Sequence, residues 1–118
     1  MCKIVEFVKL DIDFTKEPDK WFNMFLSITD DNKELQSMTK FKFGNSYTIV
    51  YNGVLSNKKP LRENLQRMDY LFKTDTDTEV ILTGYMAFGK EFFIELKGSF
   101  TFTIWDDNIK TLFTCNYI

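Results

Sequence analysis

The pattern that most constrains the fold lies near the C-terminal end of the chain. Residues 100–105 read Phe-Thr-Phe-Thr-Ile-Trp, so apolar and polar side chains alternate. An alternation with a period of two is typical of a β-strand that has one apolar face. Turn-forming residues, Asp-Asp-Asn, follow at 106–108, and residues 111–115 can return beside the first strand. The sequence therefore predicts a terminal antiparallel hairpin.

Further strands are predicted earlier in the chain, at 3–10 and 22–29. A second hairpin is predicted from strands at 41–43 and 47–51, which flank Gly44 and Asn45. The sequence Asn52-Gly53 comes directly after this hairpin and is itself a strong turn signal. We therefore expect the chain to turn at 52–53.

Helices are predicted between these two hairpins. The first begins near Pro60, where Leu61, Leu65 and Met68 follow at helical spacing. The second covers 78–88, with Thr76 or Asp77 as its N-cap and Gly89 at its end, and a short helix follows at 91–96. Helices grouped between antiparallel strands predict an α+β layered fold. The 118 residues suit a single domain, 1–118, with one core.

Composition excludes several classes of function. The chain has 15 Lys+Arg and 17 Asp+Glu, a formal net charge of -2, so no basic field exists to attract nucleic acid or an anionic membrane. Histidine is absent, which excludes a Ser-His-Asp triad, a Cys-His pair and any His-ligated metal. We therefore expect no nucleic-acid or membrane partner, no metal and no other cofactor.

The cysteines and the apolar runs indicate a location. Two cysteines, Cys2 and Cys115, are too few for a disulfide scaffold and suggest a reducing compartment. No apolar run approaches the roughly 18 residues of a membrane span, and the start lacks the features of a signal peptide. We expect a cytoplasmic protein. Cys115 is expected to be a small core residue near the end of an edge strand.

Cys2 has a possible chemical role because of its position. Removal of Met1 would leave Cys2 as the first residue, with a thiol and a free α-amine on the same carbon. The amine can then take the proton as the sulfur attacks a carbonyl group. Taken alone, a cysteine at position 2 is most often an ordinary terminal residue, so this interpretation depends on motifs elsewhere in the chain.

Four segments resemble, in the same order, the class II glutamine amidotransferase domain, and in particular the N-terminal domain of asparagine synthetases. They are Tyr51-Asn52-Gly53-Val54-Leu55-Ser56-Asn57, Leu61-Arg62-Glu63, and the stretches 74–82 and 98–106. Met1-Cys2 is similar to the start of the family, and Glu17-Pro18-Asp19 to its Gly-Pro-Asp element. The resemblance implies an N-terminal-nucleophile hydrolase fold, with two stacked antiparallel β-sheets and flanking helices, here in a truncated form.

The resemblance also implies a reaction, the hydrolysis of glutamine to glutamate and ammonia. Cys2 would be the nucleophile, with the Asn52 side-chain amide and the Gly53 backbone N–H as donors to the oxyanion. Asp77 would hold the α-ammonium of L-glutamine. The same match places Val54 and Thr76 beside the substrate. Without this match, Asn52-Gly53 would be interpreted as a turn and Asp77 as a simple helix cap.

The chain departs from the family at several positions. Lys3 stands where the family has glycine, Phe25 where an arginine clamps the α-carboxylate, and Val54 where an acidic residue is common. Phe25 cannot replace a guanidinium fork. The loop before 26–30 is shortened, and no synthetase domain follows. These departures predict weak glutamine use.

Three interpretations therefore remain open. The chain is a reduced glutaminase that supplies ammonia to a separate synthetase chain, a catalytically inactive interaction or regulatory module of the same fold, or a partial gene product. Phe25 and Val54 favour the second. Apolar surface left uncovered by the shortening would imply a partner, including a homo-oligomer.

Overall fold

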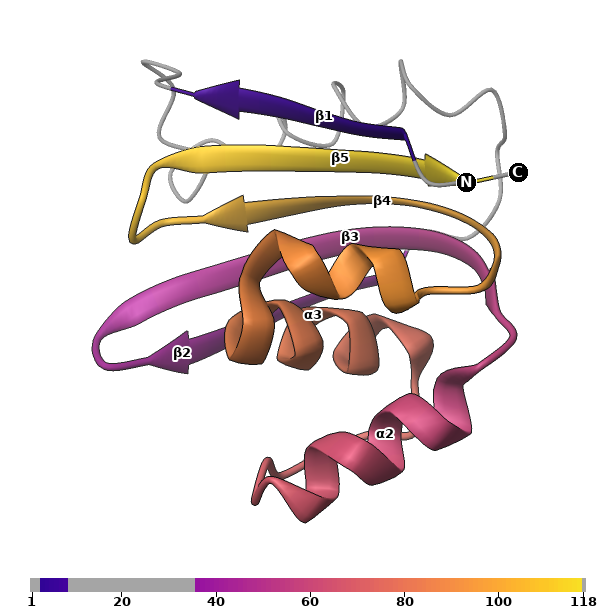
Figure 1. The fold of residues 1–118 in the computed structure, drawn as a ribbon. Helices are drawn as coiled ribbons and strands as arrows, with labels where there is room; N and C mark the ends of the chain where they lie inside the picture. The colour runs from indigo at the N-terminus through magenta and orange to yellow at the C-terminus, as the bar shows by residue number, and fades with distance from the viewer. Residues whose placement is uncertain (1–2, 9–35, 118) are drawn as a thin grey trace.

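A computed structural model describes residues 3–8 and 36–117 of the chain. The described strands form one antiparallel sheet (Figure 1). In their spatial order the five strands are β1 (Lys3–Val8), β5 (Thr111–Tyr117), β4 (Gly98–Asp106), β3 (Asn45–Leu55) and β2 (Gln36–Lys42). The predicted terminal hairpin is present as β4 and β5, and the predicted hairpin around Gly44 as β2 and β3.

The helical segments come between β3 and β4 in the chain, as predicted. They are α2 (Lys58–Arg67), α3 (Asp77–Phe88) and the 3₁₀ helix η1 (Gly89–Glu95). α3 packs on β2 and β3, while α2 and η1 pack against α3 (Figure 1). This arrangement is the predicted α+β class with antiparallel strands and flanking helices. The strand predicted at 22–29 lies outside the described residues.

Local signals explain where α3 begins and ends. Thr76 is its N-cap, because the Thr76 hydroxyl accepts a hydrogen bond from the Glu79 N–H at 3.2 Å. Asp77 is therefore the first residue of the helix and not its cap. Gly89 ends the helix with a positive φ of 72°, a conformation that favours glycine.

The turn predicted at Asn52-Gly53 is wrong, because β3 continues through both residues to Leu55. Gly53 pairs with Phe100 of β4 and has a φ of 132°. A Cβ atom at this position would lie 2.3 Å from the Ser99 carbonyl oxygen. The glycine thus allows two strands to approach closely, which is the other common role of glycine in a strand.

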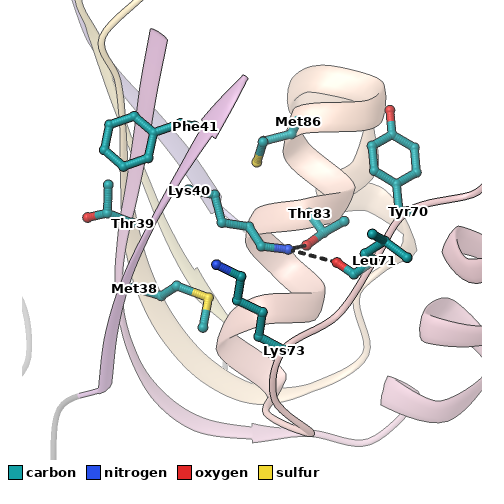
Figure 2. A pocket seen from close by; sticks show the side chains of 9 residues that line it. All are labelled: Met38, Thr39, Lys40, Phe41, Tyr70, Leu71, Lys73, Thr83 and Met86. Atoms are coloured by element: carbon teal, nitrogen blue, oxygen red, sulfur yellow. Dashed lines mark hydrogen bonds between the residues drawn. The ribbon is translucent and has the colours of Figure 1, made fainter. Parts of the chain in front are cut away.

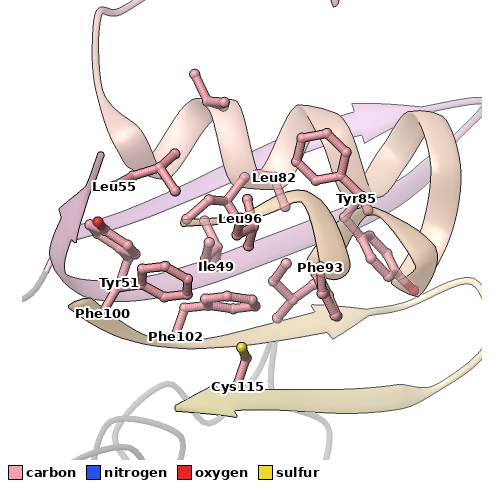
Figure 3. Close-up of a cluster of buried hydrophobic side chains, with 14 of the residues drawn as sticks. Ile49, Tyr51, Leu55, Leu82, Tyr85, Phe93, Leu96, Phe100, Phe102 and Cys115 are labelled. Atoms are coloured by element: carbon pink, nitrogen blue, oxygen red, sulfur yellow. The ribbon is translucent and has the colours of Figure 1, made fainter. Parts of the chain in front are cut away.

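The main core lies between the sheet and the helices α3 and η1 (Figure 3). Tyr85 of α3 stacks on Phe93 of η1 at 5.7 Å, and Phe93 meets Phe102 of β4 edge-on at 5.1 Å. Cys115 belongs to this core, is wholly buried and is not a free thiol. The prediction of an edge strand for Cys115 is wrong, because β5 lies between β1 and β4.

The opposite face of the sheet is buried as well. Val50, Trp105 and Leu112 are at most 2% exposed, yet they are not part of the core beneath the helices. Their neighbours along the strands belong to that core, so alternation places these three side chains on the second face. Burial of both faces is expected for a sheet inside the layered sandwich that the sequence predicts.

Candidate functional site

Four strand ends meet at one edge of the sheet. Because neighbouring strands are antiparallel, the end of β3, the start of β4, the end of β5 and the start of β1 lie together. The pairing register links Asn52 to Thr101, Thr101 to Asn116 and Asn116 to Lys3 in one row across the sheet. Three strand spacings of about 4.8 Å separate the ends of this row by about 14 Å.

Asp77 joins the N-terminus of α3 to this edge. Its Oδ2 atom accepts a hydrogen bond from the Leu55 backbone N–H at 2.9 Å and another from the Tyr51 hydroxyl at 2.9 Å. The two donors fix the carboxylate beside the last residues of β3. Burial raises the pKa of Tyr51, and so do the hydrogen bond to Asp77 and its negative charge. Tyr51 therefore remains a neutral donor.

Charges of both signs surround Asp77. Its other oxygen, Oδ1, faces the Lys58 ammonium at 4.0 Å. Lys58 also donates to the Asp75 carbonyl oxygen at 3.0 Å and lies 3.6 Å from the Asp75 carboxylate. Arg62 donates to the same carboxylate oxygen of Asp75 at 2.9 Å. The starts of α2 and α3 thus form a compact cluster of two cations and two anions.

The structure brings only part of the predicted site together. Thr76 and Asp77 lie at the end of β3, beside Leu55. The Asn52 side chain follows Tyr51 in the strand, so alternation directs it to the sheet face opposite the one that carries Tyr51 and Asp77. Gly53 and Val54 are exposed, Val54 to 67%.

Other positions that the sequence singled out are not described, or only in part. Cys2 and Phe25 lie outside the described residues. For Lys3 the structure describes only the backbone, which pairs with Asn116. The relation of Cys2 to Asn52 therefore remains a prediction.

Sequence reasoning missed the role of Glu79. This carboxylate is wholly buried, forms an ion pair with Lys40 at 2.8 Å, and accepts hydrogen bonds from the backbone N–H groups of Lys73 and Thr74. Burial favours a higher pKa, but the hydrogen bonds from Lys40, Thr74 and the two backbone groups outweigh it, and the pKa of Glu79 is lowered to about 2. Glu79 thereby holds the segment that leads into Thr76 and Asp77. Its spacing from Thr76, typical of a capping box, was the available signal.

Lys40 crosses a groove of about 420 Å³ between β2, the segment 70–73 and α3 (Figure 2). Its ammonium donates to the Thr83 hydroxyl at 2.8 Å and to the Leu71 carbonyl at 3.3 Å. The lining of the groove includes none of Asn52, Gly53 and Asp77. The groove is therefore separate from the edge where the predicted glutamine residues lie.

Two general searches apply to residues 3–8 and 36–117. Within these ranges, His, Cys, Asp and Glu side chains form no group of three or more that could hold a metal ion. The helices in the same part of the chain are too short or too polar to cross a membrane.

Comparison with known proteins gives consistent matches. A family model described as "Glutamine amidotransferase domain" matches residues 23–116. Asparagine synthetase [glutamine-hydrolyzing] 3 of Bacillus subtilis (strain 168) is 35% identical over 88 residues, which cover 75% of this chain and 14% of that protein. Asparagine synthetase [glutamine-hydrolyzing] 1 of the same strain is 41% identical over 68 residues, which cover 58% of this chain and 11% of that protein.

A solved structure shares the fold. The glutamine phosphoribosylpyrophosphate amidotransferase from B. subtilis aligns with a TM-score of 0.52 at 18% identity, over 75% of this chain and 25% of that chain. The present chain thus spans only 11–14% of the two asparagine synthetases and a quarter of the solved chain.

Proposed function

Because this chain belongs to the glutamine amidotransferase domain family, we propose that it hydrolyses the side-chain amide of glutamine to glutamate and ammonia. The reaction needs a nucleophile, a base and donors for the oxyanion that forms at the amide carbonyl. The proposal assigns these roles to the thiol and α-amine of Cys2, once Met1 is removed, and to the Asn52 amide and the Gly53 N–H.

The proposed chemistry proceeds in two steps. The Cys2 sulfur attacks the amide carbon of glutamine while its thiol proton passes to the α-amine. The tetrahedral intermediate then collapses, the α-ammonium returns the proton, and ammonia leaves a thioester. Water adds to the thioester with the amine again as base, so that glutamate departs and the thiol is restored.

The observation that carries this proposal is the meeting of elements at one edge of the sheet. The start of β1, the Asn52-Gly53 segment of β3 and the Asp77 carboxylate at the N-terminus of α3 all belong to this edge. Asp77 supports substrate binding because its carboxylate is held in place by Leu55 and Tyr51, with Oδ1 directed toward a cation at 4.0 Å. A charge-assisted contact to the substrate ammonium is consistent with that geometry.

The same proposal includes a low rate and an outlet for the ammonia. Loss of the arginine at the position of Phe25 removes a charged contact that typically contributes roughly 2–5 kcal/mol, or roughly 30- to 5,000-fold in affinity. We propose a cytoplasmic protein that delivers ammonia to a separate synthetase chain. That chain would supply the part of the longer relatives that this sequence does not match.

Ammonia release from L-glutamine tests the proposal. Mass spectrometry first establishes that Met1 is absent. We expect slow release by the processed protein, none by Cys2→Ala, and a raised KM for Asp77→Asn. Asp75→Asn is the matched control, because it makes the same chemical change two residues away on a carboxylate that is 73% exposed. Equal release by the processed protein and Cys2→Ala would refute the proposed nucleophile.

A further inference from the structure

We infer that Lys58 binds the α-carboxylate of the amino-acid substrate, so that Lys58 and Asp77 together select a zwitterion; this rests on the proposed function. A free amino acid carries an ammonium and a carboxylate on one carbon. A site that recognises both groups needs an anion and a cation side by side. Asp77 and Lys58 provide this pair, with 4.0 Å between Oδ1 and Nζ.

The contacts of the cluster leave Lys58 suited to this role. The Asp75 carboxylate has a nearer cation, because Arg62 lies 2.9 Å from Oδ1 while Lys58 lies 3.6 Å from it. An incoming carboxylate can therefore take the place of Asp75 at Lys58 while Arg62 keeps Asp75 paired. The Lys58 side chain is 31% exposed, which makes the ammonium accessible.

The start of α2 adds a second reason to expect an anion at this place. Lys58 is the first residue of this ten-residue helix, and Asn57 is its N-cap. The Asn57 side chain makes no capping hydrogen bond, because it binds the Glu95 carbonyl and the Lys97 N–H instead. The first turn also has no acidic residue. The positive end of the helix dipole thus adds to the charge of Lys58.

α3 begins in the opposite way, with Thr76 as a hydroxyl cap and two acidic residues in its first turn. The two helix starts meet at the Lys58–Asp77 contact, one with excess positive and one with excess negative charge. A zwitterion aligned across this contact would place its carboxylate at α2 and its ammonium at α3. Lys58 would then replace, from another element, the clamp that Phe25 cannot form.

Binding measured by calorimetry separates this inference from catalysis. The Cys2→Ala protein is titrated with L-glutamine and with 4-aminobutanamide, which retains the amine and the amide but lacks the α-carboxylate. Lys58→Gln removes the charge, Lys58→Arg restores it, and Lys59→Gln is the matched control on the exposed neighbouring residue. Thermal unfolding of each variant establishes that it is folded.

We expect Lys58→Gln to weaken L-glutamine binding by about 10- to 100-fold, the usual range for a hydrogen bond to a charged group. Lys59→Gln should change it by less than about twofold, Lys58→Arg should restore most of it, and 4-aminobutanamide should bind all variants alike. Equal L-glutamine binding by Lys58→Gln and Lys59→Gln, equal weakening of both ligands, or no binding of L-glutamine would overturn the inference. Binding that depends on Lys58 without ammonia release from the protein that retains Cys2 would refute the proposed hydrolysis alone.

Discussion

Replacement of Glu79 by glutamine should destabilise the protein more than any change to its exposed carboxylates. Glu79 is wholly buried and receives donors from Lys40 and from the segment 73–74. Glutamine has nearly the same shape but directs an NH₂ group toward groups that are themselves donors. It also leaves the Lys40 ammonium, which is 17% exposed, without its carboxylate.

The size of the effect follows from the pKa of Glu79. A fall from 4.5 to about 2, at about 1.36 kcal/mol per unit, gives about 3 kcal/mol for the ionised over the protonated form. Removal of one partner from a buried ion pair costs about 3–5 kcal/mol, so we expect about 3–5 kcal/mol at pH 7. Because the pKa is lower in the folded state, this stability is complete above about pH 4.5 and is lost as the pH falls toward 2. The difference between the two proteins should therefore shrink by about 2 kcal/mol at pH 3.

Urea unfolding followed by tryptophan fluorescence measures both quantities. Wild type, Glu79→Gln and the exposed control Glu63→Gln on α2 are compared at pH 7 and pH 3. The reasoning is refuted if Glu79→Gln unfolds at the same urea concentration as Glu63→Gln. A difference of the same size at both pH values would show that the carboxylate charge is not its source.

Two further predictions concern β3. Gly53→Ala should cost at least about 2 kcal/mol, because the new Cβ would lie 2.3 Å from the Ser99 oxygen at a positive φ; Gly44→Ala, where nothing lies within 4 Å, should cost only about 1 kcal/mol, and equal urea midpoints would contradict this. Tyr51→Phe should cost about 1.5–3 kcal/mol through the lost hydrogen bond to the Asp77 carboxylate, and the same variant in an Asp77→Asn background should show a smaller loss if that bond is the cause.

Local patterns in the sequence predicted much of the fold. Alternation at 100–105 identified β4, and Thr76 and Gly89 marked the ends of α3 to within a residue, because strand period and helix caps are properties of neighbouring residues. Pairing is not local. Nothing near Cys115 indicates that β1 covers the outer side of β5, so an inner strand was taken for an edge.

The errors in the candidate site have the same origin. Asn52-Gly53 has the composition of a turn, but the glycine is needed for the approach of β3 to Ser99, which lies far along the chain. Glu79 was recognised only as an acidic residue in the first turn, since its partner Lys40 belongs to a strand that precedes it by two elements. A sequence without known contacts cannot distinguish a solvated acid from a buried one.

Covalent trapping of the nucleophile tests the central claim most directly. The processed protein is treated with a glutamine-like diazoketone in the presence of a reductant, since Cys115 is not a free thiol, and the modified peptide is then mapped. The account predicts a single adduct on Cys2 that excess L-glutamine suppresses. An adduct confined to Cys115, or labelling of Cys2 that L-glutamine leaves unchanged, would contradict a glutamine site at this edge of the sheet.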